Sequence, residues 1–285
     1  MKLLEKGIFE GERALFASRG VRIHDSVFRD GESPLKESRE LELSGCSFEW
    51  KYPLWYCKDV SVSDTVLSFT ARSGIWYTDN IEMTDCDISA PKTFRRCDGI
   101  RLLRVDMPNA QETMWSCRNI SLRDVHVVGD YFAMNCENVE AENLSVEGNY
   151  IFDGSKNIVV KNSRLMSKDS FWNCQNVTVY DSVIVGEYLG WNSRNVRLVN
   201  CTVESNQGMC YMDGIVMENC RLVNTDLAFE YCRDVAADIR SDVVSIKNPI
   251  SGRISVQSCG EVIMEPERVD VSATEIIVGG KKYDV

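Results

Sequence analysis

The feature that most constrains this chain is a repeat with a period of 19 to 21 residues that runs through most of its length. Each copy starts at an aliphatic residue, which in most copies follows Asn, Asp or Gly. The starting residues are Val21, Leu41, Val60, Ile81, Ile100, Ile120, Val139, Ile158, Val177, Val196, Ile215, Val235 and Ile254. A short, fixed period of this kind is the signature of a solenoid, in which each repeat packs only against its neighbours.

Apolar residues within each copy fall two positions apart, as in Val177 and Val179, which is the period of a β-strand. Further apolar columns lie seven residues after each start and six residues before the next one, and stacking of the copies would bury all of them. The sequence therefore predicts an all-β fold, a right-handed parallel β-helix of about 13 coils with 19–20 residues and three short strands per coil. A leucine-rich-repeat horseshoe has a similar period, but its LxxLxL spacing is missing.

Two polar columns flank the first strand of each coil. Asparagine often precedes the start, as at Asn119, Asn138 and Asn176, and Asp or Asn follows it by four residues, as at Asp124 and Asn143. Asn and Asp tolerate left-handed backbone, and stacked amides can pair between coils. We therefore interpret both columns as turns.

The unbroken period predicts a single domain over residues 1–285. We expect residues 1–20 to form an N-terminal cap, because an open solenoid end is an adhesive sheet edge. Residues 21–259 are assigned to the coils and residues 260–285 to a C-terminal cap. Within that cap, Gly279-Gly280 between two β-prone segments predicts a hairpin turn.

Charge narrows the class of partner. The net charge is −11, and phosphate binding needs a basic footprint, so nucleic acid is not expected as a partner. No run of residues is long and apolar enough for a membrane span, and the charged N-terminus does not have the pattern of a secretory signal. We expect a cytoplasmic protein without a membrane partner.

The 12 cysteines fall mainly in two repeat columns, three residues before a start or five residues after one. Serine replaces cysteine in the same columns, as Ser193 does for Cys174. This interchange indicates small buried turn positions with reduced thiols. Because the chain has no CxxC pair, we predict no metal site. We expect no cofactor either.

One face of the predicted solenoid carries unusual side chains. The column five residues before each start, at the outward parity of the third strand, holds five of the 6 tryptophans. The predicted substrate-binding residues all belong to this column: Trp55, Trp76, Arg95, Trp115, Trp172, Trp191 and Glu230. An exposed aromatic patch marks a contact surface, and rings along a rod suit an oligosaccharide. The alternatives are that the tryptophans fill the core, or that another segment or a partner covers them.

Two carboxylates on this face are the candidate catalytic residues. Asp153 belongs to the tryptophan column, and Asp169 lies on the next coil. A carboxylate against aromatic rings would have a raised pKa and could donate a proton, while the other could activate water. Arg95 lies between Trp76 and Trp115 in the column, where it could either dock an anionic group or pair with Glu112.

The opening segment GIFEGERALF and the turns Cys117–Asn119, Cys136–Asn138 and Cys174–Asn176 resemble a bacterial family catalogued as domain of unknown function 3737. The coil architecture also resembles the pectin-lyase-like β-helices. The resemblance implies the β-helix fold and a bacterial intracellular setting, and it supplies no activity.

Two functions follow from the sequence. The first is a protein that binds or processes an oligosaccharide or a sugar acid along the aromatic third-strand face. The alternative is a non-catalytic interaction scaffold, with a second copy of the chain as the candidate partner. The sequence leaves open whether the protein is an enzyme.

Overall fold

The computed structural model describes residues 1–284, so Val285, the last residue of the predicted hairpin segment, lies outside the described residues. The chain divides into two compact units, residues 1–147 and residues 148–285. Each unit is a parallel β-solenoid, and together they contain about 15 turns where the sequence predicted about 13. The difference arises because the first and last strands, Lys2–Glu5 and Thr274–Val278, each pair in parallel as a further turn.

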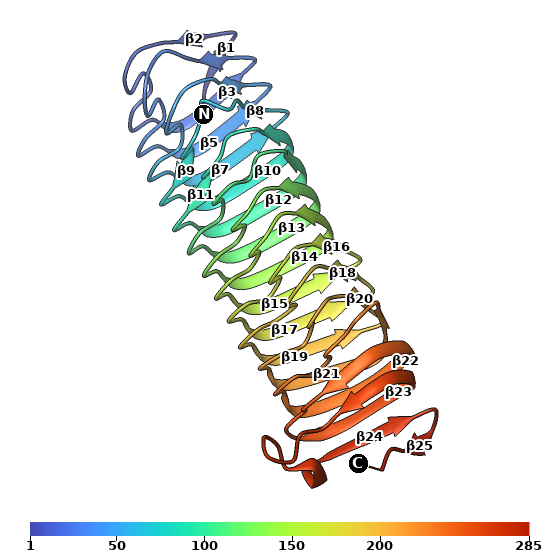
Figure 1. Ribbon diagram of the computed structural model, residues 1–285. Helices are drawn as coiled ribbons and strands as arrows, with labels where there is room; N and C mark the ends of the chain where they lie inside the picture. The colour runs from blue at the N-terminus through green and yellow to red at the C-terminus, as the bar shows by residue number, and fades with distance from the viewer. Residues whose placement is uncertain (285) are drawn as a thin grey trace. The chain divides into compact units, whose positions relative to one another are not determined.

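Unit 1 is built from parallel strands that stack coil upon coil (Figure 1). The first strand of each coil pairs in register with the next, so that Val21 lies beside Leu41 and Leu41 beside Val60. The strands are β1 (Lys2–Glu5), β2 (Ile8–Phe9), β3 (Arg19–His24), β4 (Val27–Phe28), β5 (Arg39–Ser44), β6 (Ser47–Phe48), β7 (Lys58–Ser63), β8 (Val66–Leu67), β9 (Ile75–Trp76), β10 (Asp79–Ile88), β11 (Phe94–Arg95), β12 (Asp98–Met107), β13 (Arg118–Val128) and β14 (Glu137–Glu147).

Unit 2 repeats the same parallel arrangement, with Val177 between Ile158 and Val196. A 3-10 helix, η1 (Val271–Ala273), precedes its last parallel strand. Its strands are β15 (Lys156–Lys161), β16 (Arg164–Met166), β17 (Gln175–Tyr180), β18 (Val183–Val185), β19 (Arg194–Val199), β20 (Thr202–Glu204), β21 (Asp213–Val223), β22 (Arg233–Lys247), β23 (Gly252–Ile263), β24 (Thr274–Val278) and β25 (Lys281–Lys282).

The core of each unit consists of the predicted apolar columns. All thirteen starting residues are buried, and so are the phenylalanines of the column six residues before a start, including Phe94 and Phe171. Rings of equivalent residues stack between coils, as in Phe28 on Phe48 at 4.6 Å between centroids and Phe152 on Phe171 at 5.9 Å. The repeat thus predicts the inward-facing residues correctly.

The polar columns form the expected turns. Asn138 has a φ of 59°, and its Nδ2 donates to Oδ1 of Asn119 at 3.0 Å. Unit 2 has an equivalent ladder, in which Nδ2 of Asn195 donates to Oδ1 of Asn176 at 3.1 Å. Left-handed backbone at these corners turns the chain, while the amides satisfy one another between coils.

The third side of the coil departs from the prediction of a third short strand in every coil. It consists mainly of turns, with β9 and β11 as two-residue strands that pair with each other. Residues such as Tyr52 and Tyr56 adopt positive φ, of 62° and 57°, which interrupts an extended ladder. Backbone hydrogen bonds still join these turns, as from Leu54 N to Gly74 O at 2.8 Å.

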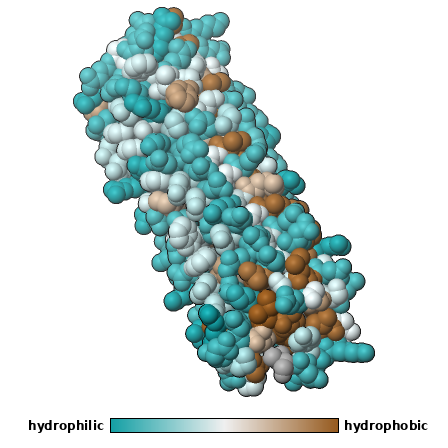
Figure 2. Space-filling model, in the orientation of Figure 1, coloured by the Kyte–Doolittle hydropathy of each residue, from teal (hydrophilic) through white to brown (hydrophobic). Residues whose placement is uncertain are grey.

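The last coils of unit 2 are less regular than the rest. The register shifts between Ile239 and Asp242 where β22 pairs with β23, and Gly279 and Gly280 lie between the antiparallel strands β24 and β25. Figure 2 shows brown, hydrophobic side chains gathered over these coils on the face in view. Val244 of β22 is 53% exposed.

Candidate functional site

The tryptophans predicted at outward positions lie on the surface of the third side in both units. Trp55, Trp76 and Trp115 are half-buried, whereas Trp172 and Trp191 are 36% and 37% exposed. The adjacent inward column is fully buried. The alternative that the tryptophans fill the core is therefore wrong, because the inward positions are already occupied by residues such as Phe94.

In unit 1 the column forms a closed stack, which we call the indole ladder (Trp55, Trp76, Arg95 and Trp115). The rings of Trp55 and Trp76 are 5.0 Å apart and 7° from parallel. The Cζ of Arg95 lies 4.6 Å from the ring centroid of Trp76 and 4.7 Å from that of Trp115. Both faces of the Trp76 indole are thus covered, so a sugar ring could reach only its edge.

Backbone hydrogen bonds hold the indole ladder against the coil. Nε1 of Trp76 donates to the carbonyl of Lys92 at 2.9 Å, and Nε1 of Trp115 donates to that of Tyr131 at 2.7 Å. Each of these two indoles therefore reaches the backbone of the next coil. The hydrogen bond satisfies Nε1, the one polar atom of a half-buried indole.

Glu112 is the carboxylate beside the indole ladder. Its Oε2 lies 3.0 Å from Nζ of Lys92 and 3.8 Å from Nη2 of Arg95. The pairing of Arg95 with Glu112, one of the two alternatives drawn from the sequence, is thus present as an ion pair, but at a distance beyond hydrogen-bond length.

A second ladder, one residue further along each coil, was not anticipated from the sequence. The rings of Tyr56 and Tyr77 stack at 4.8 Å and 3°, and the Cζ of Arg96 lies 5.8 Å from the Tyr77 centroid. The same column in unit 2 holds Tyr211 and Tyr231, whose centroids are 5.2 Å apart. The signal that could have found it is the recurrence of tyrosine four residues before a start.

In unit 2 the tryptophans are arranged differently. Trp172 contacts Tyr150 in a tilted pair at 5.9 Å, and Trp191 stacks on Tyr211 at 5.0 Å. Tyr188 meets Trp191 edge-on at 5.7 Å. Among the residues that the structure describes, no aromatic contact joins Trp172 to Trp191, so the two indoles turn toward different neighbours.

The two candidate catalytic carboxylates lie on this part of unit 2. Asp169 is 6% exposed, and burial raises its pKa to about 6; nearby Lys168 lowers the pKa, and the charges of Asp153 and Glu187 raise it. Asp153 is half-buried, and burial raises its pKa against the effect of a hydrogen bond from Asn173 at 3.3 Å. Burial is therefore the main cause of the raised pKa of each carboxylate.

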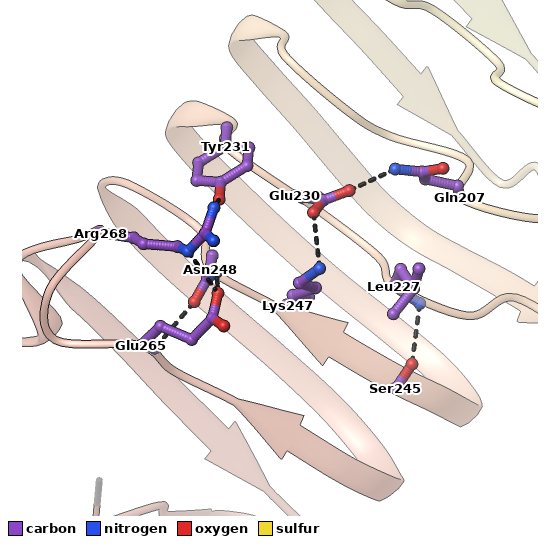
Figure 3. A network of polar contacts seen from close by, with 9 residues as sticks. All are labelled: Gln207, Leu227, Glu230, Tyr231, Ser245, Lys247, Asn248, Glu265 and Arg268. Carbon is purple, nitrogen blue, oxygen red and sulfur yellow. Dashed lines mark hydrogen bonds and ion pairs between the residues drawn. The ribbon is translucent and has the colours of Figure 1, made fainter.

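Glu230, the last predicted binding residue, is a buried carboxylate and does not face a ligand on the surface. It is 5% exposed, its Oε1 lies 3.0 Å from Nζ of Lys247, and Nε2 of Gln207 donates to its Oε2 (Figure 3). In the same figure Arg268 joins Tyr231 and Glu265 in a separate network. Both carboxylate oxygens of Glu230 thus have a partner within the protein.

The cysteines are free thiols and mostly buried, as the repeat predicted, but Cys86, Cys220 and Cys259 lie within strands β10, β21 and β23, where turn positions were predicted. Eleven of the twelve are buried, and Cys259 is partly exposed. Several of the thiols donate to backbone carbonyls of the preceding coil, as from Cys97 to Ile75 at 3.2 Å. Within residues 1–284 no group of three His, Cys, Asp or Glu side chains could hold a metal, and no helix is long and apolar enough to cross a membrane.

Comparison with solved structures finds other proteins of similar architecture. PfbA, a surface adhesin of Streptococcus pneumoniae, has a TM-score of 0.40 and 7% identity, with 91% of this chain and 82% of that chain covered. The A-module of the mannuronan C-5 epimerase AlgE4 of Azotobacter vinelandii has a TM-score of 0.32 and 10% identity, with 92% and 86% covered. These likenesses concern the fold and carry no argument about activity.

No curated protein matches the chain. The family described as protein of unknown function (DUF3737) matches residues 2–277, so the chain belongs to this family.

Proposed function

We propose that unit 2 binds an oligosaccharide on its third side, with Trp172 and Trp191 as the platforms for sugar rings. The observation that carries this proposal is the exposure of the two indoles and the way their rings pair. They are 36% and 37% exposed, and they contact different aromatic neighbours instead of each other. Exposed aromatic surface of this kind marks a contact site on a protein.

Polar groups beside the two indoles suit sugar hydroxyls. Nδ2 of Asn192 donates to Oδ1 of Asn173 at 2.9 Å, and Nδ2 of Asn173 donates to Oδ1 of Asp153 at 3.3 Å. This chain of amides ends on a carboxylate, which has further capacity to accept hydrogen bonds. Aromatic surface with a few fixed polar groups is the usual composition of a small-molecule site.

The proposal extends to hydrolysis of the bound sugar as a hypothesis, motivated by the raised pKa values of Asp153 and Asp169. With a pKa of about 6, Asp169 is partly protonated near neutral pH and could give its proton to the departing glycosidic oxygen. Asp153 would take a proton from the water that attacks the anomeric carbon, with inversion of configuration. Product analysis with Asp169→Asn and Asp153→Asn tests this step, and hydrolysis that survives both substitutions would exclude it.

The binding proposal is tested by titrating the full chain with a panel of neutral and acidic oligosaccharides while tryptophan fluorescence is followed. We expect Trp172→Ala to weaken binding about tenfold, the effect of losing one stacking ring. Trp50 provides a matched control because it is 37% exposed but lies outside the column, beside Lys51. Equal losses in Trp50→Ala and Trp172→Ala, or no response to any sugar, would reject the proposal.

Sedimentation separates oligosaccharide binding from the interaction scaffold. A dimer that forms with rising protein concentration and disappears in Trp172→Ala would assign the same surface to a second copy of the chain. A monomer at all concentrations, together with a fluorescence response to sugar, supports the binding of an oligosaccharide.

A further inference from the structure

Arg95 of unit 1 is held in a fixed orientation but donates no hydrogen bond. Its guanidinium lies between the indoles of Trp76 and Trp115, at 4.6 and 4.7 Å from their centroids. Within residues 1–284 the side chain has no hydrogen-bond acceptor, and its Nε is buried without a partner. A guanidinium offers five N–H donors in a planar fork, so the donors along its outer edge are open to an acceptor.

Other surface arginines of unit 1 differ in this respect. Arg104 binds Asp85 through two hydrogen bonds of 2.6 and 2.7 Å, and Arg118 donates to Asp98 at 3.0 Å. The repeat supplies these arginines with a carboxylate on the preceding coil. For Arg95 the preceding coil supplies Trp76 instead, which fixes the plane of the guanidinium but accepts none of its hydrogen bonds.

The charge around Arg95 favours an anion. Lys92 and Arg96 lie on the same coil, so three cations are close in sequence and on one side of the solenoid. The carboxylate of Glu112 is 3.0 Å from Lys92 and 3.8 Å from Arg95. One carboxylate shared between two cations leaves the group with net positive charge in a chain of net charge −11.

We propose that Arg95 anchors an oxyanion-binding site on the third side of unit 1. The ligand group is a carboxylate or a phosphate or sulfate ester, which the outer edge of the guanidinium binds in a bidentate manner. Lys92 adds a second positive charge, and Glu112 competes with the ligand for both cations. The site is independent of the oligosaccharide site proposed for unit 2, because none of its residues belongs to that unit.

The test is calorimetric titration of the full chain at low ionic strength with glucuronate, glucose, inorganic phosphate and sulfate. We expect at least one anion to bind and glucose, the neutral match of glucuronate, not to bind at this site. Because the contact is between charges near the surface, affinity should fall as salt is raised. Binding of glucuronate alone indicates a carboxylate ligand, and binding of phosphate or sulfate alone indicates a ligand with a phosphoryl or sulfuryl group.

Three variants decide the residue assignment. Arg95→Lys keeps the charge but loses the planar fork and should weaken binding about tenfold. Glu112→Gln removes the competing carboxylate and should tighten binding about threefold. Arg104→Ala is the matched control, since it removes one positive charge that is already engaged by Asp85.

The proposal is overturned if no anion binds at about 10 mM, a concentration at which even a site with a millimolar Kd would be mostly filled. It is also overturned if Arg95→Lys binds as tightly as the native chain, or if Arg104→Ala loses as much affinity. Thermal unfolding of each variant in the absence of ligand shows whether the fold is retained. If Arg95→Lys does not fold, Glu112→Gln decides the assignment. Anion binding that is not tightened in Glu112→Gln would then overturn the proposal.

Discussion

The two units use one sequence column in opposite ways. In unit 1 the side chains of the column stack on one another. The centroids of Trp55 and Trp76 are 5.0 Å apart, and the Cζ of Arg95 lies 4.6 Å from the Trp76 centroid. In unit 2 Trp172 and Trp191 contact different neighbours and keep more than a third of their surface exposed. The difference teaches that an outward aromatic column can serve stability or recognition according to how its rings are paired. A closed stack adds contacts between coils, whereas separated rings leave apolar surface for a ligand.

The largest expected effect tests whether the indole ladder is structural. Trp76→Ala removes a ring that is covered on both faces and a hydrogen bond to Lys92, so we expect a loss of about 3 kcal/mol in the free energy of unfolding. Trp172→Ala removes a more exposed ring and should cost about 1 kcal/mol. Urea unfolding followed by circular dichroism measures both values. Equal losses would abolish the distinction between the two units.

A second comparison concerns the charged residue that replaces a ring near the end of the column in unit 2. Glu230→Gln leaves Lys247 without its carboxylate in a mostly buried setting, and we expect it to cost about 2 kcal/mol. Glu218→Gln breaks an exposed pair with Arg197, also 3.0 Å long, and should cost less than about 0.5 kcal/mol. If Glu230→Gln were as mild as the control in urea unfolding, Glu230 would be free for the ligand role predicted from its column.

The sequence predicted the column positions but not how the side chains pair within them. Period and parity alone place Phe94 inside and Arg95 outside, because both follow from a strand repeat. They do not decide whether Trp172 turns toward Tyr150 or toward Trp191, because both neighbours are one coil away. Pairing of this kind depends on rotamers and on the space left by adjacent residues, which the repeat does not specify.

The partner of Glu230 and the turns of the third side were missed for other reasons. Lys247 follows Glu230 by 17 residues, because β22 and β23 pair Val235 with Gly252, a spacing of 17 residues, where the repeat predicted Ile254 as the equivalent of Val235. Tyr52 and Tyr56 adopt left-handed backbone, which residues other than Gly, Asn and Asp rarely do. Tyrosine at these positions therefore did not indicate a turn. A buried position for Asp169 was likewise not indicated by a residue type that is normally exposed.

The pH dependence of stability offers a finer test of unit 2. Asp169 has a pKa of about 6 in the folded protein, above the value of about 4 expected in the unfolded chain. The folded state therefore holds this proton more tightly, so the group lowers stability as the pH rises from about 4 to about 6. Asp169→Asn should raise stability by about 1–2 kcal/mol at pH 7.5, relative to its effect at pH 4.

The matched substitution in unit 1 should respond in the opposite direction. The hydrogen bond from Arg104 lowers the pKa of Asp85, so its contribution is present at neutral pH and is lost as the pH falls through the folded pKa. Asp85→Asn should therefore lose stability at pH 7.5 and lose little at the lowest pH. Urea midpoints measured across this range test both signs, and parallel pH profiles for the two variants would contradict the assigned environments.

The smallest expected effect concerns the thiols, which should distinguish the regular coils from the irregular end of unit 2. Every cysteine of unit 1 is buried, and burial raises the pKa of Cys97, so little reactive thiolate is present. Cys259 lies on β23, where the register has shifted, and it is the partly exposed cysteine of the twelve. A thiol reagent should therefore modify Cys259 first in the native protein and all 12 cysteines after denaturation. Cys259→Ser should remove the fast reaction and leave the urea midpoint unchanged, because the side chain is partly exposed and a serine hydroxyl can keep the hydrogen bond to the carbonyl of Glu261. Fast modification of several thiols in that variant would mean that the coils open far more readily than their hydrogen-bonded, closely packed ladders imply.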